Sequence, residues 1–524
     1  MRLNQLPLTF VILLFLITGS QADVRLPGMF GDNMVLQADK TVPVWGWAEP
    51  GEKITVKCDR QKAVAIADQT GKWRVQLEGL KPDSRPTIMT VAGRNAITFT
   101  NVLVGEVWLG SGQSNMEMAM KDITNSKEEM ASATNSSIRL FTVPRLFTGI
   151  PTHDVEAKWI VCSPENIKEF SATLYLFGRE IVSKTKRPLG LIHSSVGGTR
   201  IELWTAPEGL PDSTNVIKAL DQTIENYRKE LPAQLAELEK WTKKAKAALV
   251  DGTDMPPAPE MRTPGSSNPL YNGMIHPLVP YAIRGAVWYQ GEWNGGEDEV
   301  YHQRMKALVA GWRSVWSMPE MPFYYVQLAR MPEKDHSPWL GNGLAPTRDA
   351  QRRSLDIPHT GMAVIIDLEG SSGWHPGDKQ DVGLRLSLWA LRNEYGMKDL
   401  ACSGPLYKSM TVEGNRIRIK FDNVGSGLLI ASKTGVAPIK RTPDQKLNSF
   451  AIAGSDPAAT AGSAVASNKW FNASATIDGN DVLVSAPEVP NPVAVRYAYC
   501  NDPEGCNLYN KEELPASPFR TDNW

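Results

Sequence analysis

Residues 102–119 read VLVGEVWLGSGQSNMEMA, in which an apolar run stops at a short polar turn. The run from Val102 to Leu109 is typical of a buried strand, and the turn from Gly110 to Asn115 contains two serines. One interpretation is a strand-to-helix turn, in which glycine supplies unusual backbone angles and serine or asparagine caps the helix. The other is a catalytic nucleophile, because a serine on such a turn is lifted out of the sheet beside amides that can bind an oxyanion. This stretch alone leaves both interpretations open.

Downstream of this stretch the chain alternates between buried strands and amphipathic helices. Apolar runs typical of fully buried strands are PLGLIHSS (188–195), IRGAVWYQ (283–290), PFYYVQLA (322–329) and GMAVIIDL (361–368). Between them lie helical patterns such as Phe170, Leu174, Phe177 and Ile181 on one face. The alternation predicts an α/β fold with a parallel sheet covered by helices on both faces. Ligands of such sheets bind beyond the carboxyl ends of the strands.

The length and the changes of pattern predict several domains. At 524 residues the chain exceeds the roughly 250 to 300 residues at which one hydrophobic core stops growing. Residues 23–101 alternate in short apolar runs between turn signals and are predicted to form a β-domain. Residues 102–396 carry the strand and helix alternation, with a helical insertion at about 215–250 in which Pro232 should cause a bend or a restart. Residues 397–524 return to a β-rich pattern.

The N-terminus is predicted to be a cleaved secretory signal. An apolar run from Leu8 to Ile17 is followed by small residues around Ala22, where a signal peptidase would cut. The run is far shorter than the roughly 20 residues that span a bilayer, so residues 1–22 are expected to be removed. No later stretch is long and apolar enough for a transmembrane helix. The protein is therefore expected to be secreted or periplasmic without a membrane anchor.

Composition excludes some classes of function and favours others. Lys plus Arg (56) nearly balance Asp plus Glu (57), and no long basic run occurs, which argues against a nucleic-acid partner. The 16 tryptophans suit a protein that binds sugar rings, although tryptophan is also ordinary core material. Among five cysteines, Cys500 and Cys506 bracket a short loop, where an oxidising compartment would permit a disulfide. No CxxC pair occurs, so no metal site is expected.

Polar residues gather just after the predicted strands. The positions are Ser114 after the first strand, Gly197 and Gly198 after the second, Gln290, Glu292 and Asn294 after the third, and Asp367, Glu369 and His375 after the last. One serine, backbone amides, carboxylates and a histidine would thus share one rim of the sheet. Acyl transfer needs this set, because it uses a nucleophile, a base, an orienting acid and an oxyanion hole.

The motifs around these residues resemble those of one esterase family. The matching blocks are LPGMFGDNMVLQ (26–37), VPVWGWAEPGE (42–52), GEVWLGSGQSNMEM (105–118), SSVGGTRIELW (194–204), LYNGMIHPLVPYAIRGAVWYQGEWN (270–294), PFYYVQLA (322–329), HPGDKQDVGLRL (375–386), VRYAYCNDPEGCNLYN (495–510) and LPASPFRTDNW (514–524). The chain is similar to the sialate O-acetylesterase family of carbohydrate acetylesterases, in the SGNH-hydrolase superfamily. The resemblance implies a flavodoxin-like three-layer core and a secreted serine esterase. Such an enzyme removes O-acetyl groups from sugars through an acetyl-serine intermediate, without a metal or an organic cofactor.

The resemblance also implies roles for the residues at the rim. It makes Ser114 the nucleophile and His375 the general base. The backbone N–H groups of Ser114 and Gly198 are expected to be oxyanion donors, together with the side chain of Gln290 or Asn294.

The orienting acid departs from the usual pattern. Many SGNH enzymes place an aspartate two or three residues before the histidine, where this chain has Gly373 and Ser372. Glu292 of the QGEWN block is the preferred replacement, and Asp367 is the alternative, with Glu369 considered beside it. A third arrangement is a serine–histidine dyad in which a backbone carbonyl takes the place of the acid.

Three residues are expected near the substrate. An anionic sugar favours an arginine at the site, and Arg200 and Arg348 are the candidates, with a structural ion pair as the equal alternative for Arg200. His276 is expected to line the pocket, with a structural role as its alternative. The O-acetylated substrate stays open between sialic acid and acetylated xylan or another hemicellulose. A different class, an inactive carbohydrate-binding protein, also stays open, and the sequence does not indicate an oligomeric state.

Overall fold

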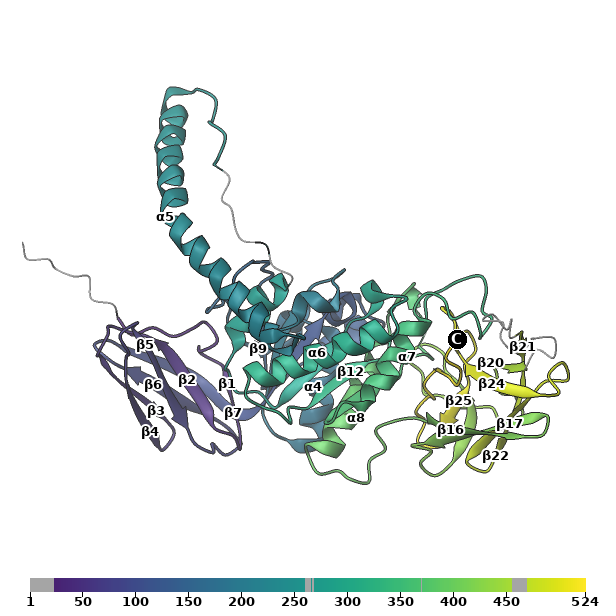
Figure 1. Ribbon diagram of the computed structural model, residues 1–524. Helices are drawn as coiled ribbons and strands as arrows, with labels where there is room; N and C mark the ends of the chain where they lie inside the picture. Colours follow the sequence, from purple (N-terminus) through teal and green to yellow (C-terminus); the bar gives the residue numbers. More distant parts are fainter. Residues whose placement is uncertain (1–22, 260–264, 266–267, 369, 455–468) are drawn as a thin grey trace, which may run out of the picture.

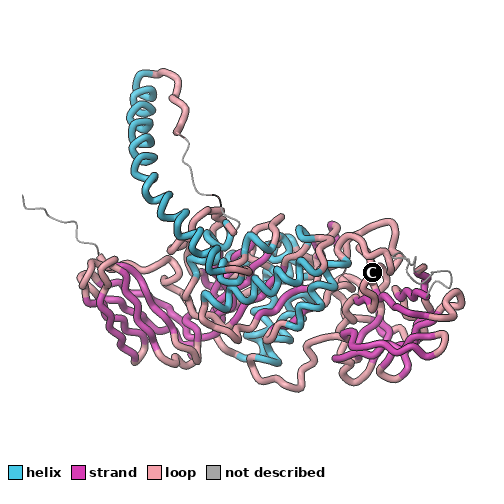
Figure 2. The backbone as a smooth tube through the Cα atoms, viewed as in Figure 1, coloured by secondary structure: helices cyan, strands magenta, loops and turns pink. Residues whose placement is uncertain are grey.

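The computed structural model describes residues 23–259, 265, 268–368, 370–454 and 469–524. Three regions follow one another along the chain: a β-region, a central α/β region and a second β-region (Figure 1). Figure 2 shows that the helices are concentrated in the central region. The predicted signal, residues 1–22, and Glu369 lie outside the described residues. Within the described ranges, no helix combines the length and the apolar character needed to cross a membrane.

The first β-region consists of short, mostly antiparallel strands. Its strands are β1 Val35–Gln37, β2 Val42–Trp47, β3 Lys53–Cys58, β4 Gln61–Ile66, β5 Lys72–Leu77 and β6 Asp83–Ala92. β2 pairs with β5, while β3 pairs with both β4 and β6. Along β5 the buried side chains Trp73, Val75 and Leu77 alternate with exposed ones, as expected for a sheet with one covered face.

One strand, β7 (Ala96–Gly112), belongs to both the first β-region and the central region. Its first part pairs antiparallel with β6, and its last part lies between two parallel strands of the central sheet. Side chains alternate between exposed and half-buried up to Asn101 and are all buried from Val102 onward. The change of pattern marks where both faces of one strand become covered, because a strand covered on one face alternates and one covered on both does not. The expected domain border between these two residues therefore falls inside β7.

The central sheet is mostly parallel and has β7 in its middle. Its other strands are β8 Asn135–Thr142, β9 Ile160–Cys162, β10 Leu189–Ser195, β11 Gly285–Tyr289, β12 Phe323–Val326 and β13 Thr360–Ala363. The order across the sheet is β13-β12-β11-β7-β10-β8-β9, with β9 antiparallel to β8 and the other pairs parallel. At the end of β7, Gly112 lies beside Ser195 on one side and Tyr289 on the other. The residues that follow these three strands therefore meet at one edge.

Helices cover both faces of this sheet. The α-helices are α1 Ser114–Glu117, α2 Ser126–Ala131, α3 Pro164–Ile167, α4 Ala172–Thr185, α5 Ser213–Asp251, α6 Glu299–Val315, α7 Ala345–Arg353 and α8 Lys379–Asn393. α4 and α8 share one core with Val287 of β11, whereas α6 shares the other with Trp288, the next residue of the same strand. Successive side chains of a strand point to opposite faces, so the two cores lie on opposite sides of the sheet. The predicted α/β fold with a mostly parallel sheet is confirmed.

The expected helical insertion is the long helix α5. It runs for 39 residues with Pro232 inside it, so the helix does not restart there. A proline removes one backbone hydrogen bond, and the helix continues on both sides of that gap. Ala245 and Ala248 are its buried side chains. Figure 1 shows α5 curving as it projects away from the body of the molecule.

The second β-region packs around a core of its own. Its strands are β16 Leu406–Glu413, β17 Arg416–Asp422, β18 Leu428–Ser432, β19 Lys440–Arg441, β20 Phe450–Gly454, β21 Trp470–Asn472, β22 Ser474–Asp478, β23 Asp481–Ser485, β24 Pro492–Tyr497, β25 Leu508–Asn510 and β26 Phe519–Arg520. Ile419, Phe450 and Tyr497 lie in this core.

The disulfide that the spacing of Cys500 and Cys506 would permit is not formed in the structure, where both are free thiols. The Cys500 sulfur lies 3.6 Å from the carbonyl oxygen of His336, and the Cys506 sulfur lies 3.0 Å from that of Pro503. Each thiol thus has its own carbonyl acceptor.

A buried arginine joins the second β-region to the central sheet. Arg348 of α7 is completely buried. Its guanidinium donates to the carbonyls of Leu328 and Ala329, just after β12, and to those of Cys500 and Asn501. The candidate role of Arg348 in binding an anionic sugar is therefore wrong, because its donors are used inside the protein.

A buried carboxylate ties three segments together at the amino ends of the central strands. Glu106 of β7 is completely buried and accepts hydrogen bonds from Arg284 (2.7 Å), Arg187 (2.7 Å) and Gln37 of β1 (3.0 Å). Burial alone would raise the pKa of Glu106. The hydrogen bonds from Arg284, Gln37 and Arg187, together with the charge of Arg284, outweigh burial and lower the pKa below its usual value.

We expect Glu106→Gln to destabilise the fold by about 3 kcal/mol, because it removes the paired carboxylate from the mostly buried guanidinium of Arg284. The midpoint of thermal unfolding at pH 7, measured by calorimetry, should fall. Since the pKa of Glu106 is lowered in the folded protein, its stabilisation is present above the usual glutamate pKa and is lost as the pH falls through the folded value.

The difference in unfolding midpoint between the parent protein and Glu106→Gln should therefore become smaller at acidic pH. Glu169→Gln is the control, because the Lys121–Glu169 pair is exposed and should contribute less than about 1 kcal/mol. Equal midpoints for Glu106→Gln and the parent protein at pH 7 would contradict the interpretation.

Candidate active site

The serine of the opening motif stands at a turn that requires glycine. Gly112 has φ +139°, and a Cβ at this position would lie 2.1 Å from the carbonyl oxygen of Tyr289. Gln113 then takes an extended conformation and caps α1 without a side-chain hydrogen bond to the helix. Ser114 is the first residue of α1, so its N–H has no partner within the helix. Ser111 lies buried within β7, so neither serine acts as the helix cap.

Ser114 and His375 meet although 261 positions separate them in the chain. The hydroxyl oxygen of Ser114 lies 2.8 Å from Nε2 of His375. His375 belongs to the two-residue strand β15 (His375–Pro376), which pairs with β14 (Gly370–Ser372). Burial lowers the pKa of His375, and the nearby charge of Lys379 lowers it further. The imidazole is therefore neutral at neutral pH and can accept the serine proton.

Glu292 does not orient the histidine directly, which corrects the preferred assignment of the acid. Among the described residues, no hydrogen bond or ion pair joins a carboxylate to His375. The Glu292 carboxylate accepts instead from the side-chain amide of Asn115 (2.6 Å), and that amide also donates to the carbonyl of Trp374 (2.9 Å). Burial raises the pKa of Glu292. Glu292 therefore reaches the histidine loop only through Asn115.

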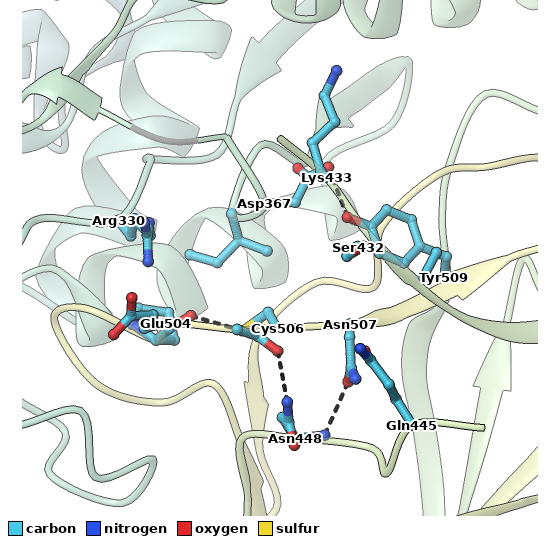
Figure 3. Close-up of a pocket in the computed structure, with 14 residues that line it drawn as sticks. Arg330, Asp367, Ser432, Lys433, Gln445, Asn448, Glu504, Cys506, Asn507 and Tyr509 are labelled. Atoms are coloured by element: carbon cyan, nitrogen blue, oxygen red, sulfur yellow. Dashed lines mark hydrogen bonds between the residues drawn. The ribbon is translucent and has the colours of Figure 1, made fainter. Parts of the chain in front are cut away.

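Asp367, the alternative acid, is held elsewhere. Both of its oxygens accept from the guanidinium of Arg385 (2.6 and 2.8 Å), and the hydroxyl of Tyr509 donates to one of them (3.1 Å). Figure 3 shows Asp367 at a polar cavity of about 220 Å³ that residues of the second β-region, such as Lys433, also line. Its role is to join the two regions.

The loop after β10 brings backbone amides to the serine. A Cβ at Gly197 would lie 3.4 Å from the Cβ of Ser114, so the two segments are in contact. The N–H of Gly197 donates to the carboxylate of Glu117 (2.8 Å), whereas within the described residues the N–H of Gly198 has no acceptor. Gly198 has φ +72°, which favours glycine. Gly198 thus offers its amide, and Gly197 fixes the turn.

The two side chains expected as oxyanion donors have other partners. Gln290 donates to the carbonyl of Thr199 (3.0 Å) and to Asn294 (2.8 Å). Asn294 donates to the carboxylates of Glu202 (3.2 Å) and Glu297 (3.1 Å). Both amides are completely buried and brace the loop, so neither has a free donor and this expectation is wrong.

Gln113, which the sequence reasoning missed, has a free donor instead. Its side-chain oxygen accepts from the backbone amides of Gly291 and Trp293, each at 3.5 Å. No acceptor within the described part of the chain binds its side-chain nitrogen. The signal that could have found it is its position next to Ser114.

Two exposed tryptophans flank the serine and the histidine, and the sequence reasoning missed both. The side chain of Trp293 is 57% exposed, and its indole nitrogen lies 3.2 Å from the position of a Cβ at Gly198. Trp374 is 39% exposed, and its ring centroid lies 6.3 Å from that of His375. Exposed indole rings beside a polar site suit the apolar faces of sugar rings.

Arg200 forms the structural ion pairs that were the alternative to substrate binding. It bonds to the carboxylates of Glu202 (2.7 Å) and Glu297, and it donates to the carbonyl of Trp293 (3.0 Å). The hydrogen bond to Glu202 and the charge of that carboxylate raise the pKa of Arg200, although burial lowers it. These bonds match the structural alternative, in which the guanidinium holds Trp293 in place, and substrate binding by Arg200 stays a prediction.

His276 lies away from the serine. Its Nδ1 is 2.6 Å from the carbonyl oxygen of Thr152, and its ring packs against His153. It lines a cavity of about 640 Å³ at the base of α5, whose walls include neither Ser114 nor His375. The structural role considered for His276 therefore fits, and its place in the substrate pocket does not.

Comparisons with known proteins show which family the chain resembles. Residues 250–378 match the family model described as "Carbohydrate esterase, sialic acid-specific acetylesterase". The chain is 30% identical over 424 residues to sialate O-acetylesterase of Mus musculus, covering 74% of this chain and 76% of that protein. It is 28% identical over 539 residues to the Homo sapiens protein of the same name, covering 94% and 92%.

A solved structure is similar over the whole chain. The crystal structure of a carbohydrate acetylesterase from Xanthomonas citri superposes with a TM-score of 0.76 at 32% identity, covering 96% of this chain and 100% of that one. The chain belongs to the sialate O-acetylesterase family and is a carboxylic ester hydrolase.

Proposed function

We propose that the chain removes O-acetyl groups from carbohydrates with Ser114 and His375 acting as a catalytic dyad. The observation that carries the proposal is the 2.8 Å contact between the serine hydroxyl and the histidine Nε2, with Gly197 of the loop after β10 lying against the serine. Two exposed tryptophans border the same site. The family relationship supports the ester chemistry.

The reaction proceeds in two acyl-transfer steps. His375 takes the proton of the Ser114 hydroxyl as its oxygen attacks the acetyl carbonyl. The resulting tetrahedral oxyanion collapses, the bond between the carbonyl carbon and the sugar oxygen breaks, and the sugar leaves with the proton from His375. A water molecule then gives its proton to His375 and attacks the acetyl-serine, which releases acetate and restores the serine hydroxyl.

The oxyanion is bound by three donors. Two are the backbone N–H groups of Ser114, at the start of α1, and of Gly198. The third is the side-chain amide of Gln113, in place of Gln290 and Asn294. Because the side-chain oxygen of Gln113 accepts from the amides after β11, its side-chain nitrogen is directed away from those amides.

The proposal includes the fold of the central region, the domain bounds and the location of the enzyme. The strands β10-β7-β11-β12-β13 have the spatial order 2-1-3-4-5 of flavodoxin-like sheets, which supports an SGNH-type core with β8 and β9 added at its edge. We assign residues 1–22 to a signal peptide, 23–101 to an N-terminal β-domain, 102–396 to the hydrolase domain and 397–524 to a C-terminal β-region. The enzyme is secreted or periplasmic.

The substrate class has two candidates. The relatives are named for sialate, an anionic sugar. One observation favours a neutral acetylated sugar such as acetylxylan. Arg200, which lies two positions after Gly198, is bound to Glu202 and Glu297. A guanidinium with two carboxylate partners is poorly placed to pair with a third carboxylate.

We expect Ser114→Ala to lower kcat for 4-nitrophenyl acetate by roughly four orders of magnitude, because the nucleophile is lost. The midpoint of thermal unfolding should stay close to that of the parent protein. Activity within about tenfold of the parent would exclude this serine. Turnover that disappears in the variant also excludes a protein that only binds sugars.

Asp367→Asn is the matched control for this test. It weakens the pairing with Arg385 and should lower the unfolding midpoint, while kcat on the same ester stays within about threefold of the parent value. A loss of kcat as large as that of Ser114→Ala would restore Asp367 as the catalytic acid.

We expect Trp293→Ala and Trp374→Ala each to raise KM for an acetylated oligosaccharide by about three- to tenfold, the effect of losing a stacked ring worth about 0.5 to 1.5 kcal/mol. Kinetics on 4-nitrophenyl acetate, which has no sugar, should change little. Trp524→Ala, at an exposed tryptophan at the C-terminus, is the control. An unchanged KM in both variants would rule out the stacking role.

The substrate class is tested by comparing acetylated sialic acid with acetylated xylan in the parent protein and in Arg200→Ala. Because Arg200 holds the carbonyl of Trp293, we expect the variant to lower kcat/KM to a similar extent on both substrates. A loss confined to the sialic acid substrate would instead indicate direct recognition of its carboxylate.

A further inference from the structure

We propose that Lys379 is a positioning residue which, together with Asn115, clamps the backbone on both sides of His375 and so replaces the missing triad acid. The proposal rests on the esterase function proposed above. It adds a reason why a histidine that has no carboxylate partner among the described residues stays aligned with its serine.

Lys379 occupies a position that general rules disfavour. It is the first residue of α8, and its side chain is completely buried. A buried ammonium group is costly, and positive charge at a helix N-terminus opposes the helix dipole. Helix stability does not explain a lysine here, so the reason lies in what its amino group binds.

The amino group binds the loop that carries the histidine. Nζ of Lys379 donates to the carbonyl of Pro376 (2.8 Å) and to the side-chain oxygen of Asn115 (2.6 Å). The side-chain nitrogen of Asn115 donates to the carbonyl of Trp374 (2.9 Å). The two carbonyls that flank His375 are therefore both held by one hydrogen-bonded pair of side chains.

This pair connects the base to the nucleophile through short, buried links. Asn115 directly follows Ser114 in α1, and Glu292 accepts a second hydrogen bond from its amide (2.6 Å). A shift of residues 374–376 away from Ser114 would break the buried hydrogen bond from the Lys379 amino group to the Pro376 carbonyl. A triad acid holds the imidazole by its Nδ1, whereas this clamp holds the backbone that carries it.

The surroundings of Lys379 determine what its loss would change. Its charged and titratable neighbours are Glu292, Asp378 at the cap of α8, His375, and Tyr289, whose ring centroid lies 5.4 Å away. Burial lowers the pKa of Lys379 to about 7, although the negative charges of Glu292 and Asp378 raise it. Its charge in turn lowers the pKa of His375, so removing that charge should raise it.

The test is Lys379→Met, which keeps the length and apolar stem and removes the amino group. On 4-nitrophenyl acetate we expect kcat to fall about 100-fold, the effect of a small misplacement of a catalytic group, with KM within about threefold of the parent value. The acid limb of the pH profile of kcat/KM should move to higher pH. If Lys379 only stabilised the fold, its loss would lower the unfolding midpoint without moving the acid limb.

Lys433→Met is the matched control. The side chain of Lys433 is also buried and pairs with Asp378 and Asp381 at the same end of α8. Among the described residues, no hydrogen bond or ion pair joins it to Trp374, His375 or Pro376. Its loss should lower the unfolding midpoint and leave both kcat and the acid limb unchanged.

The proposal is overturned if Lys379→Met keeps kcat within about threefold of the parent value or leaves the acid limb in place. If circular dichroism shows that this variant does not fold, Lys379→Gln is judged by the same two criteria. Ser114→Ala, measured in parallel, separates the two proposals. Activity retained there refutes the esterase site itself, whereas activity lost there with normal Lys379→Met kinetics refutes only the clamp.

Discussion

The active site depends on how β7 ends against β11. At Gly112 the backbone passes so close to the Tyr289 carbonyl that no side chain fits, and the strand must turn at once into α1. This contact fixes the position of Ser114 relative to the sheet. Because β7 is continuous with the first β-region, the strand that pairs with β6 there also places Ser114, the proposed nucleophile.

Much of this arrangement could be predicted from the sequence, because it follows from strand order. Residues just after parallel strands gather at one edge, so Ser114, Gly198 and His375 were expected together. In the structure Ser114 contacts His375, and Gly197, the residue before Gly198, lies against Ser114. The start of β7 could not be predicted, since a change from alternating to continuous burial resembles the beginning of a new strand.

The hydrogen-bond partners of the polar side chains could not be predicted from the sequence. Gln290 and Asn294 stand at the predicted rim, yet they bond to each other and to the loop beside them. Glu292 stands one residue from Gly291 on the same turn but is separated from His375 by the amide of Asn115. Which acceptor an amide reaches depends on side-chain rotamers and on segments distant in sequence, and neither is visible in a motif.

The guanidinium of Arg348 has a consequence for how the chain is made. Two of its four carbonyl acceptors lie near residue 328, and the other two are Cys500 and Asn501. On the ribosome, the α/β core is synthesised long before residue 501 leaves the exit tunnel. Until then Arg348 cannot be buried with its full set of acceptors, so the nascent enzyme completes its core only when almost the entire polypeptide has been translated.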